Sequence, residues 1–416
     1  MNRESLNRTL RARVAVLRAF RDPFPAESRL LLRLSRHEWE PLLNWLDTSG
    51  LALYLYDRLL ELKSAQHLPD RVRSRLEQNG RDNAERTRDL MEQGRAIHLE
   101  FQRAGLSYAM VKGISLWPTA VPKLELRSQL DLDFLMDEGS APEARRILEA
   151  RGYGLQAISG RTWEFKTASA AAPSIRDLYK AEGRRSVELH LEAKLPGRRS
   201  LLERARTLEL PGAGVPVLPS AELLLGHGMH LYKHVLSEFI RAAHMIEFRR
   251  HVLARRSDDA LWSEIRSLAG EDLRVTWGLG IVTLLAERLT GEFAPRALTD
   301  WTVDRLPPAA RTWVEIYGTR SVLSPFPGSK LYLLLQSALE SAGIPAKRTI
   351  GRALVPIKLP PPIAQATQQA GLRERARRYR IQLSYVLFRL RFHIIEGARY
   401  AWESARWRNR LQASAR

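Results

Sequence analysis

The sequence predicts an α+β protein in which a mixed segment of strands and helices lies between two helical regions. Residues 1–104 show helical periodicity, as in HEWEPLLNWLDTSGLALYLYDRLLEL, with a break expected at Ser49-Gly50. Residues 105–217 contain short apolar runs that alternate with polar residues, a pattern typical of strands. The helical pattern returns after Ser220, a favourable N-cap, and predicts a helical domain over residues 218–354.

The last predicted region, residues 355–416, combines a Pro-rich linker, VPIKLPPPIAQ, with a basic amphipathic tail. The chain has a formal net charge of +20, and residues 347–416 hold 16 Lys and Arg against 3 acidic residues, so they contribute +13. Helical spacing places five apolar residues on one stripe: Leu383, Val386, Leu387, Leu390 and Ile394. Three interpretations stay open: the stripe packs on the body, or residues 366–416 contact an anionic membrane or nucleic acid.

Composition narrows the class of protein. With 416 residues, 44% of them hydrophobic, the chain can form two or three domains with sizeable cores. It has no cysteine, which excludes disulfides, thiolate metal sites and cysteine nucleophiles. The basic N-terminal segment has no continuous apolar stretch of the signal-peptide type, and no run is long enough for a membrane span. These features predict a cytoplasmic protein.

The segment RSQLDLDFLM carries two aspartates separated by one residue. In a strand, Leu130, Leu132 and Phe134 would face one side, and Asp131 and Asp133 the other. Two like charges on one strand face repel each other and have no packing role. They suit a site in which Mg²⁺ bridges carboxylates and a polyphosphate, because hard oxygen ligands are those that Mg²⁺ prefers.

Upstream, the segment SYAMVKGISLWPTA predicts a buried strand over Tyr108 to Val111 and a helix from Ile114. A glycine between strand and helix lets backbone N–H groups approach a phosphate, and the helix N-terminus favours the negative charge. Lys112 adds a mobile positive charge beside Gly113. The alternative is a plain strand–turn–helix with a solvated lysine.

Downstream, the segment SVELHLEAKL predicts a second half-buried strand. Its apolar face is Val187, Leu189 and Leu191, and Glu188 and His190 lie on the opposite face. If this strand pairs beside the one with the aspartates, Glu188 completes a three-carboxylate cluster. We expect carboxylate oxygens on adjacent strands, near enough to share a metal ion directly or through water.

Four short motifs occur in a recognisable order. They are Lys112-Gly113, Arg127-x-x-x-Asp131-x-Asp133, Arg151-Gly152-Tyr153 and Glu188-Leu189-His190. Together they resemble the bacterial uncharacterised nucleotidyltransferase family, whose pattern is K-G, R-x-x-x-D-x-D, G-Y and D-L-H. This family belongs to the nucleotidyltransferase-fold superfamily, whose catalytic core is similar to that of DNA polymerase β. Two departures stand out: Lys-Gly replaces the superfamily's usual Gly-Ser, as in this family, and Glu188 replaces the third aspartate.

The resemblance implies a nucleotidyltransferase-like mixed sheet with flanking helices, embedded between the two helical regions. It also implies that Asp131, Asp133 and Glu188 are catalytic and hold Mg²⁺ (or Mn²⁺). The nucleoside triphosphate would be bound by Lys112, Gly113, Arg127, Ser128 and His190. The acceptor is left open among a sugar, a small metabolite, a protein and an RNA end. The competing hypothesis is a non-catalytic binding module recruited through its basic tail.

Histidines form a further pattern in AELLLGHGMHLYKHVLSEF. His227, His230 and His234 fall on one face of a predicted helix. Three histidines on one straight helix cannot all converge on one ion with tetrahedral geometry, so the sequence favours a polar face closing the nucleotide cleft. We expect His230 and His234 to lie nearest the substrate, and Glu247 to stand where the related family has an acid.

Overall fold

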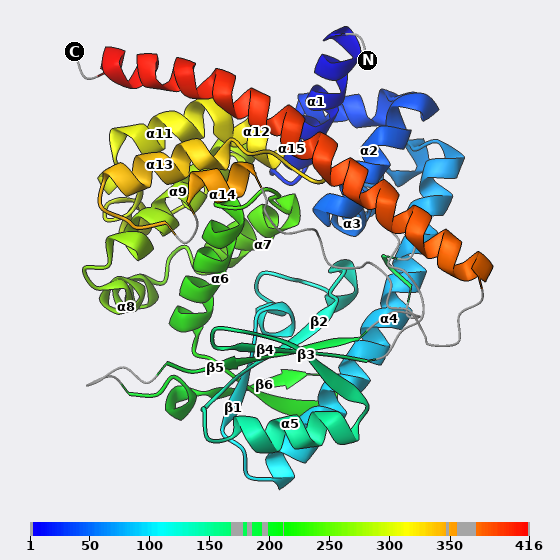
Figure 1. The fold of residues 1–416 in the computed structure, drawn as a ribbon, viewed down its shortest axis with the longest axis vertical. Helices are drawn as coiled ribbons and strands as arrows, with labels where there is room; N and C mark the ends of the chain where they lie inside the picture. Colours follow the sequence, from blue (N-terminus) through cyan, green and yellow to red (C-terminus); the bar gives the residue numbers. More distant parts are fainter. Residues whose placement is uncertain are drawn as a thin grey trace.

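The structure, a computed structural model, describes residues 3–167, 178–180, 185–193, 199–210, 212–346, 349–355 and 372–414. It confirms the predicted α+β class: a mixed sheet fills the lower half of Figure 1 and helices fill the upper half. The predicted linker lies outside the described residues apart from Val355. The division into four regions stays a prediction.

Among the N-terminal helices, α2 begins and ends at the expected sequence signals. Ser35 and Glu38 form a capping box at the start of α2, and Gly50, with φ 77°, ends it in the left-handed conformation. The predicted break at Ser49-Gly50 is therefore confirmed. The elements of this part are α1 (Arg3–Arg18), η1 (Ala26–Arg33), α2 (Arg36–Ser49), α3 (Ala52–Glu61), η2 (Ala65–His67) and α4 (Asp70–Arg103).

Seven strands form one sheet in the order β3-β4-β5-β2-β1-β7-β6. The strands are β1 (Tyr108–Val111), β2 (Asp131–Met136), β3 (Tyr153–Ser159), β4 (Thr162–Thr167), β5 (Ser186–Leu191), β6 (Arg206–Leu210) and β7 (Ala213–Val217). The pairs β2–β5 and β1–β7 are parallel and the other pairs are antiparallel. The sheet is therefore mixed, as predicted.

The two faces of the sheet differ in chemistry. One face packs on α4 and α5 (Ala141–Ala150) through a hydrophobic core that includes Phe101, Leu132, Phe134, Val187 and Leu189. Because side chains alternate along a strand, Asp133, Glu188 and His190 project from the other face. The alternation in the sequence predicted this separation correctly.

The predicted helix from Ile114 is wrong. The segment forms η3, a four-residue 3₁₀ turn over Gly113–Leu116, and the chain is extended again at Trp117. Pro118 explains the difference, because a proline disfavours helical backbone in the preceding residue and cannot donate to a helix. No α-helix N-terminus therefore stands behind Lys112-Gly113 to bind a phosphate.

Helices after the sheet build the largest core of the molecule. They are α6 (Ser220–Val235), α7 (Ala242–Leu253), α8 (Asp259–Ala269), α9 (Leu273–Thr290), α10 (Arg296–Thr299), α11 (Pro308–Trp313), α12 (Thr319–Val322), α13 (Tyr332–Ser341) and α14 (Ile350–Leu354). The π-helical turn η8 (Val314–Gly318) joins α11 to α12; the 3₁₀ turns η4 (Leu124–Leu126), η6 (Leu202–Arg204) and η7 (Val303–Arg305) complete the elements. Buried residues of α1–α4 belong to the same hydrophobic cluster as those of α6–α13. In the described part of the chain, no helix combines the length and the hydropathy needed to cross a membrane.

The C-terminal helix α15 (Leu372–Ser414) runs diagonally across the helical half in Figure 1. It packs on the body through Phe392 and Trp407, which are buried, and through Glu396, which accepts hydrogen bonds from Ser329 Oγ (3.0 Å) and the Lys330 backbone N–H (3.2 Å). Tyr317 Oη donates to Glu403 at 3.1 Å. These contacts attach one face of the helix to the body.

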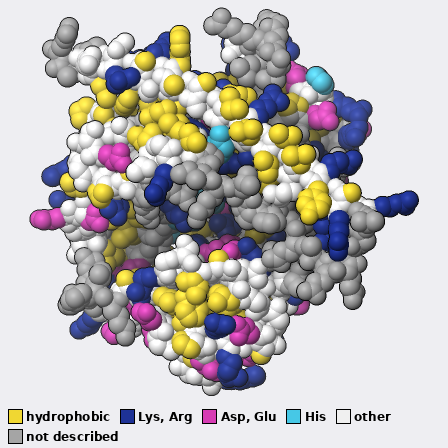
Figure 2. Space-filling view, viewed as in Figure 1, with side chains coloured by type: hydrophobic (Ala, Val, Ile, Leu, Met, Phe, Trp, Pro, Cys, Tyr) yellow, Lys and Arg dark blue, Asp and Glu magenta, His cyan; other side chains and the backbone are white. Residues whose placement is uncertain are grey.

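The predicted apolar stripe of α15 lies away from these contacts. Four of its members are largely exposed: Leu383 (59%), Leu387 (55%), Leu390 (53%) and Ile394 (64%). Val386 is partly buried. The interpretation in which the stripe packs on the body is therefore wrong, because Phe392 and Trp407 on the opposite face make that contact. Figure 2 shows hydrophobic side chains among basic ones along the path of this helix.

Candidate active site

Four charged or titratable side chains meet where β1 ends beside β2 and β5. The parallel register places Asp133 opposite Glu188 on adjacent strands. Lys112 follows β1 and its Nζ donates to Asp133 Oδ1 at 2.6 Å and to Glu188 Oε2 at 3.4 Å. His190 Nε2 lies 2.8 Å from Asp133 Oδ1 and 3.3 Å from Glu188 Oε2. We call Lys112, Asp133, Glu188 and His190 the acid cluster.

The backbone at Lys112 is held in an unusual conformation. Lys112 has φ 55° and Gly113 has φ 22°, values that residues with a Cβ rarely adopt. A Cβ on Gly113 would also come within 2.2 Å of Gln129 Nε2, which donates to the Asp131 carbonyl at 2.7 Å. The positive φ favours glycine at position 113, the Gln129 side chain fills the space that a Cβ would take, and the turn aims Lys112 at the carboxylates.

Burial and like charges set the protonation of the carboxylates. Burial, followed by the charges of Asp133 and Glu188, raises the pKa of Asp131 to about 6. For Glu188, a hydrogen bond from His190 is the main reason that its pKa is lowered to about 2. Glu188 is therefore ionised across the physiological range, whereas Asp131 is partly protonated near pH 6. Asp133 is almost completely buried, at 3% exposure.

His190 is oriented from the neighbouring strand. Its Nδ1 lies 3.1 Å from Thr162 Oγ1 at the start of β4. Burial alone would lower the pKa of His190, but its hydrogen bonds to Asp133 and Glu188 outweigh burial and raise it. A protonated His190 would add positive charge beside Lys112, whose Nζ lies 3.0 Å from His190 Nε2.

Arg127 and Ser128 occupy less open positions than the acid cluster. Arg127 Nε donates to Glu247 Oε1 at 3.1 Å, and Tyr54 Oη donates to the same oxygen at 3.0 Å. Ser128 is buried and its Oγ accepts a hydrogen bond from Arg241 Nη2 at 3.0 Å. Arg127 lines the cavity beside the acid cluster, whereas Ser128 and Arg241 are not part of its lining.

A cavity of about 430 Å³ adjoins the acid cluster. Lys112, Arg127 and His190 line it from the sheet side, and His227, His230, His244 and Glu247 line it from α6 and α7. His230 lines this cavity, and the expectation that His230 and His234 lie nearest the substrate stays a prediction. His234 is not part of the lining. Whether this cavity binds nucleotide stays a proposal.

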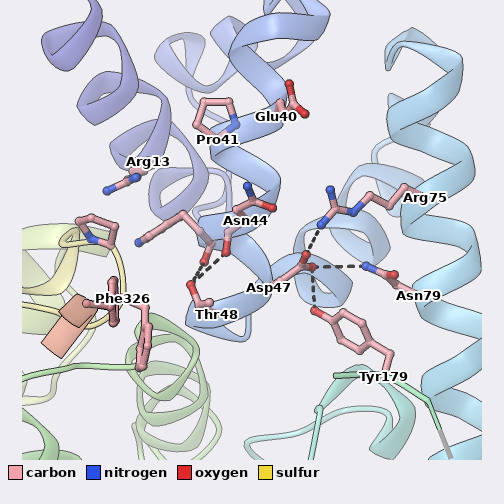
Figure 3. Close-up of a pocket in the computed structure, with 13 residues that line it drawn as sticks. Arg13, Glu40, Pro41, Asn44, Asp47, Thr48, Arg75, Asn79, Tyr179 and Phe326 are labelled. Carbon is pink, nitrogen blue, oxygen red and sulfur yellow. Dashed lines mark hydrogen bonds and ion pairs between the residues drawn. The ribbon is translucent and has the colours of Figure 1, made fainter. Parts of the chain in front are cut away.

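A larger cavity, of about 890 Å³, lies between α1, α2, α4 and the segment at Phe326 (Figure 3). At its wall Asp47 accepts hydrogen bonds from Asn79 Nδ2 at 3.3 Å and Tyr179 Oη at 3.1 Å. No member of the acid cluster lines it. The smaller cavity is therefore the one that adjoins the acid cluster, through Lys112 and His190.

The acid cluster has donors suited to a divalent cation. Ligand atoms of Asp133, Glu188 and His190 lie within 4.8 Å of one another, and Asp131 stands outside this tight group. Carboxylate oxygens are the ligands that Mg²⁺ and Mn²⁺ prefer. The Lys112 ammonium forms ion pairs with both Asp133 and Glu188, so the space between these carboxylates favours positive charge. The residues therefore fit the ion that the sequence resemblance implies.

Sequence reasoning missed several residues around this site. Thr162 contacts His190 because of the register between β4 and β5, and the side chain of Gln129 packs against Gly113. No local sequence pattern reveals either contact. Arg241 reaches Ser128 from the start of α7. His244 was visible in AAHMIEF, three residues before Glu247, and a helix of period 3.6 places both on one face. That spacing was the one available signal.

Comparison with known proteins agrees with the motifs. The family model described as an uncharacterised nucleotidyltransferase matches residues 35–291, more than half of the chain. Among solved structures, the chain is similar to an antigenic nucleotidyltransferase-like protein from Paracoccidioides brasiliensis, at 11% identity and a TM-score of 0.31, over 52% of this chain and 98% of that chain. No curated protein matches the sequence. Given the match over residues 35–291, this chain belongs to the uncharacterised nucleotidyltransferase family.

Proposed function

We propose that this protein transfers a nucleoside monophosphate from a nucleoside triphosphate to an acceptor hydroxyl, with Mg²⁺ or Mn²⁺ as cofactor. The observation that carries the proposal is the meeting of Asp133 and Glu188 on parallel neighbouring strands, with Lys112 and the 430 Å³ cavity beside them. Family membership supports the same chemistry.

The acid cluster is costly as a purely structural feature. Burying a carboxylate requires compensating charge and hydrogen bonds, and well-packed apolar residues are often at least as stable. Here Asp133 is buried beside two further carboxylates, and burial with their charges raises the pKa of Asp131. Clusters with perturbed pKa values of this kind occur preferentially at functional sites.

We assign roles from position and charge. Asp133 and Glu188 would hold the cation directly, and Asp131, which stands outside that group, would hold it through water. The low pKa of Glu188 suits a ligand that stays ionised. When bound, the ion would neutralise phosphate charge and lower the pKa of the acceptor hydroxyl. Lys112 would bind the triphosphate through its ammonium, aided by Arg127 and His190, which line the same cavity.

The proposed reaction forms a bond from the acceptor oxygen to the α-phosphorus and breaks the bond between that phosphorus and the bridging oxygen. Pyrophosphate leaves, and the hydroxyl proton passes to a carboxylate of the site or to water. The acceptor class stays open among sugar, metabolite, protein and RNA. A non-catalytic binding module would share the fold and lack this turnover.

A second proposal concerns the exposed stripe of α15, defined as Leu383, Leu387, Leu390 and Ile394. We propose that it docks on an anionic lipid surface. The helix is about 65 Å long and carries eleven arginines against three glutamates. Arg380 and Arg391 are exposed beside the stripe, and the aromatic side chains of Tyr379 and Trp402 are also exposed.

Lipid fits this surface better than nucleic acid does. A nucleic acid needs the arginines and gains little from four exposed aliphatic side chains, because its affinity comes mainly from phosphate contacts. An interfacial helix uses both features: its apolar face enters the boundary of the acyl chains and its basic residues meet anionic headgroups.

The acid cluster predicts how one carboxylate affects nucleotide binding. Asp133→Asn should lower the affinity for Mg²⁺ with ATP, GTP, CTP or UTP by at least about tenfold, because a metal ligand is lost; tenfold equals about 1.4 kcal/mol. Isothermal titration measures this. The matched control is Glu149→Gln, an exposed carboxylate on α5 that contacts Arg145 on the opposite side of the sheet and should bind as wild type does. Wild-type protein that binds none of these nucleotides with Mg²⁺ or Mn²⁺ would favour the non-catalytic module.

The raised pKa of Asp131 predicts a stability gain on its neutralisation. The pKa of Asp131 is about 6 in the folded protein and 3.8 ordinarily, so ionisation of Asp131 lowers the free energy of unfolding. This loss is complete above pH 6 and shrinks progressively toward pH 4. Asp131→Asn should therefore raise the free energy of unfolding in EDTA by about 1–3 kcal/mol at pH 7.5, and by clearly less at pH 4.5. Urea unfolding checks both values. An Asp131→Asn protein no more stable than wild type at pH 7.5 would contradict the electrostatic account; exposed Glu209→Gln is the control.

Vesicle sedimentation tests the stripe. Wild-type protein should bind vesicles of phosphatidylcholine with phosphatidylglycerol, lose most binding in high salt and retain a residual fraction through apolar insertion. Replacing the four stripe residues by serine should remove that residual fraction without lowering thermal stability, since these side chains are exposed. Absent vesicle binding, or RNA binding that the serine variant retains in full, would reject the lipid proposal.

A further inference from the structure

Three histidines from two helices converge at the wall of the cavity. His230 and His234 lie one turn apart on α6, and His244 comes from the first turn of α7. One ring nitrogen from each lies within 4.8 Å of the other two. The ring centroids are separated by 4.7, 5.3 and 4.9 Å. We call His230, His234 and His244 the histidine cluster.

The spacing of these nitrogens suits a tetrahedral metal ion. Two ligands at 2.0–2.1 Å from Zn²⁺ in tetrahedral geometry lie about 3.4 Å apart. His230 Nε2 and His234 Nε2 are separated by 3.2 Å, close to that value. The nitrogen of His244 would need to approach by at most about 1.4 Å, which is within the reach of side-chain rotation.

The surroundings of the rings support ligation. His244 Nδ1 is buried and has no hydrogen-bond partner among the described residues, a condition that native proteins rarely leave unexplained. The His234 ring has a hydrogen bond with the backbone of Phe239, the kind of contact that fixes the orientation of metal-binding histidines. Burial lowers the pKa of His230 to about 3 and of His234 to about 4, so both rings are neutral at physiological pH.

The histidine cluster differs chemically from the acid cluster. Three neutral imidazoles suit Zn²⁺ or a similar transition metal, whereas carboxylates suit Mg²⁺ or Mn²⁺. Arg127, Arg241 and Lys112 are near enough to depress the pKa of these histidines. A dication among such groups requires an anionic fourth ligand, and His230 and His244 line the cavity from which a phosphate or hydroxide could supply it.

We propose that His230, His234 and His244 form a second metal site, which takes Zn²⁺ or a similar transition metal through three imidazole nitrogens and an anion from the cavity. Three protein ligands with one remaining position are the arrangement of zinc sites that bind a water or substrate molecule. The proposal stands apart from nucleotidyl transfer, because an inactive protein could carry the same site.

Tag-free full-length protein tests the site through its bound metal. After growth with added zinc and dialysis, elemental analysis should find about one Zn²⁺ per chain. The stripped protein should bind Co²⁺ with the visible absorption typical of four-coordinate cobalt. His244→Asn and His230→Asn should each weaken Co²⁺ binding by at least tenfold. The visible absorption is the readout, because it reports four-coordinate cobalt at this site, whereas the acid cluster can also take a divalent ion.

A second pair of buried histidines supplies the control. His227 Nδ1 and His251 Nδ1 lie 3.3 Å apart in the same helical layer, outside the histidine cluster. His251→Asn should retain Co²⁺ binding and its absorption. Wild-type protein without zinc and without the cobalt absorption would overturn the proposal even if a variant failed to fold. Equal loss of binding in His251→Asn and His244→Asn, with folding intact in both, would also overturn it.

Discussion

The parallel pairing of β2 with β5 is the contact on which the site depends. It sets Asp133 beside Glu188 at a spacing that no neighbouring residues in sequence could provide. Two carboxylates so placed repel each other in a poorly solvated position, and Lys112 offsets that repulsion by donating to both. The positive φ of Lys112 is then understandable, since the backbone must turn sharply at the end of β1 to deliver its ammonium.

The site also joins parts of the chain that are distant in sequence. Arg127, just before β2, reaches Glu247 on α7, and Tyr54 on α3 donates to the same carboxylate. All three side chains are buried or nearly so, so this polar contact fixes the sheet against both sets of helices. The shared hydrophobic cluster of the N-terminal and later helices supports it from behind. The cavity wall opposite the carboxylates is thereby held in place.

Local patterns predicted what depends on local geometry. Alternation assigned Leu132 and Asp133 to opposite faces, because the period of a strand is fixed. The alternation could not show that the Gln129 side chain covers Gly113. The prediction of a helix from Ile114 overlooked Pro118, which prevents a helix there. On α15 the sequence contained two apolar sets, and only packing decided that Trp407 contacts the body. His244 joins His230 through helix packing, which spacing along one helix cannot reveal.

Nucleotidyl transfer at this site depends on the acid cluster binding a cation together with a triphosphate. A crystal structure with Mn²⁺ and a non-hydrolysable nucleoside triphosphate tests it most directly, because anomalous scattering locates manganese independently of the model phases. We expect a manganese peak in contact with Asp133 and Glu188, with phosphate oxygens completing the ligands and Lys112 turned toward the phosphates. Nucleotide bound elsewhere, or manganese absent from these carboxylates at saturating concentration, would contradict it.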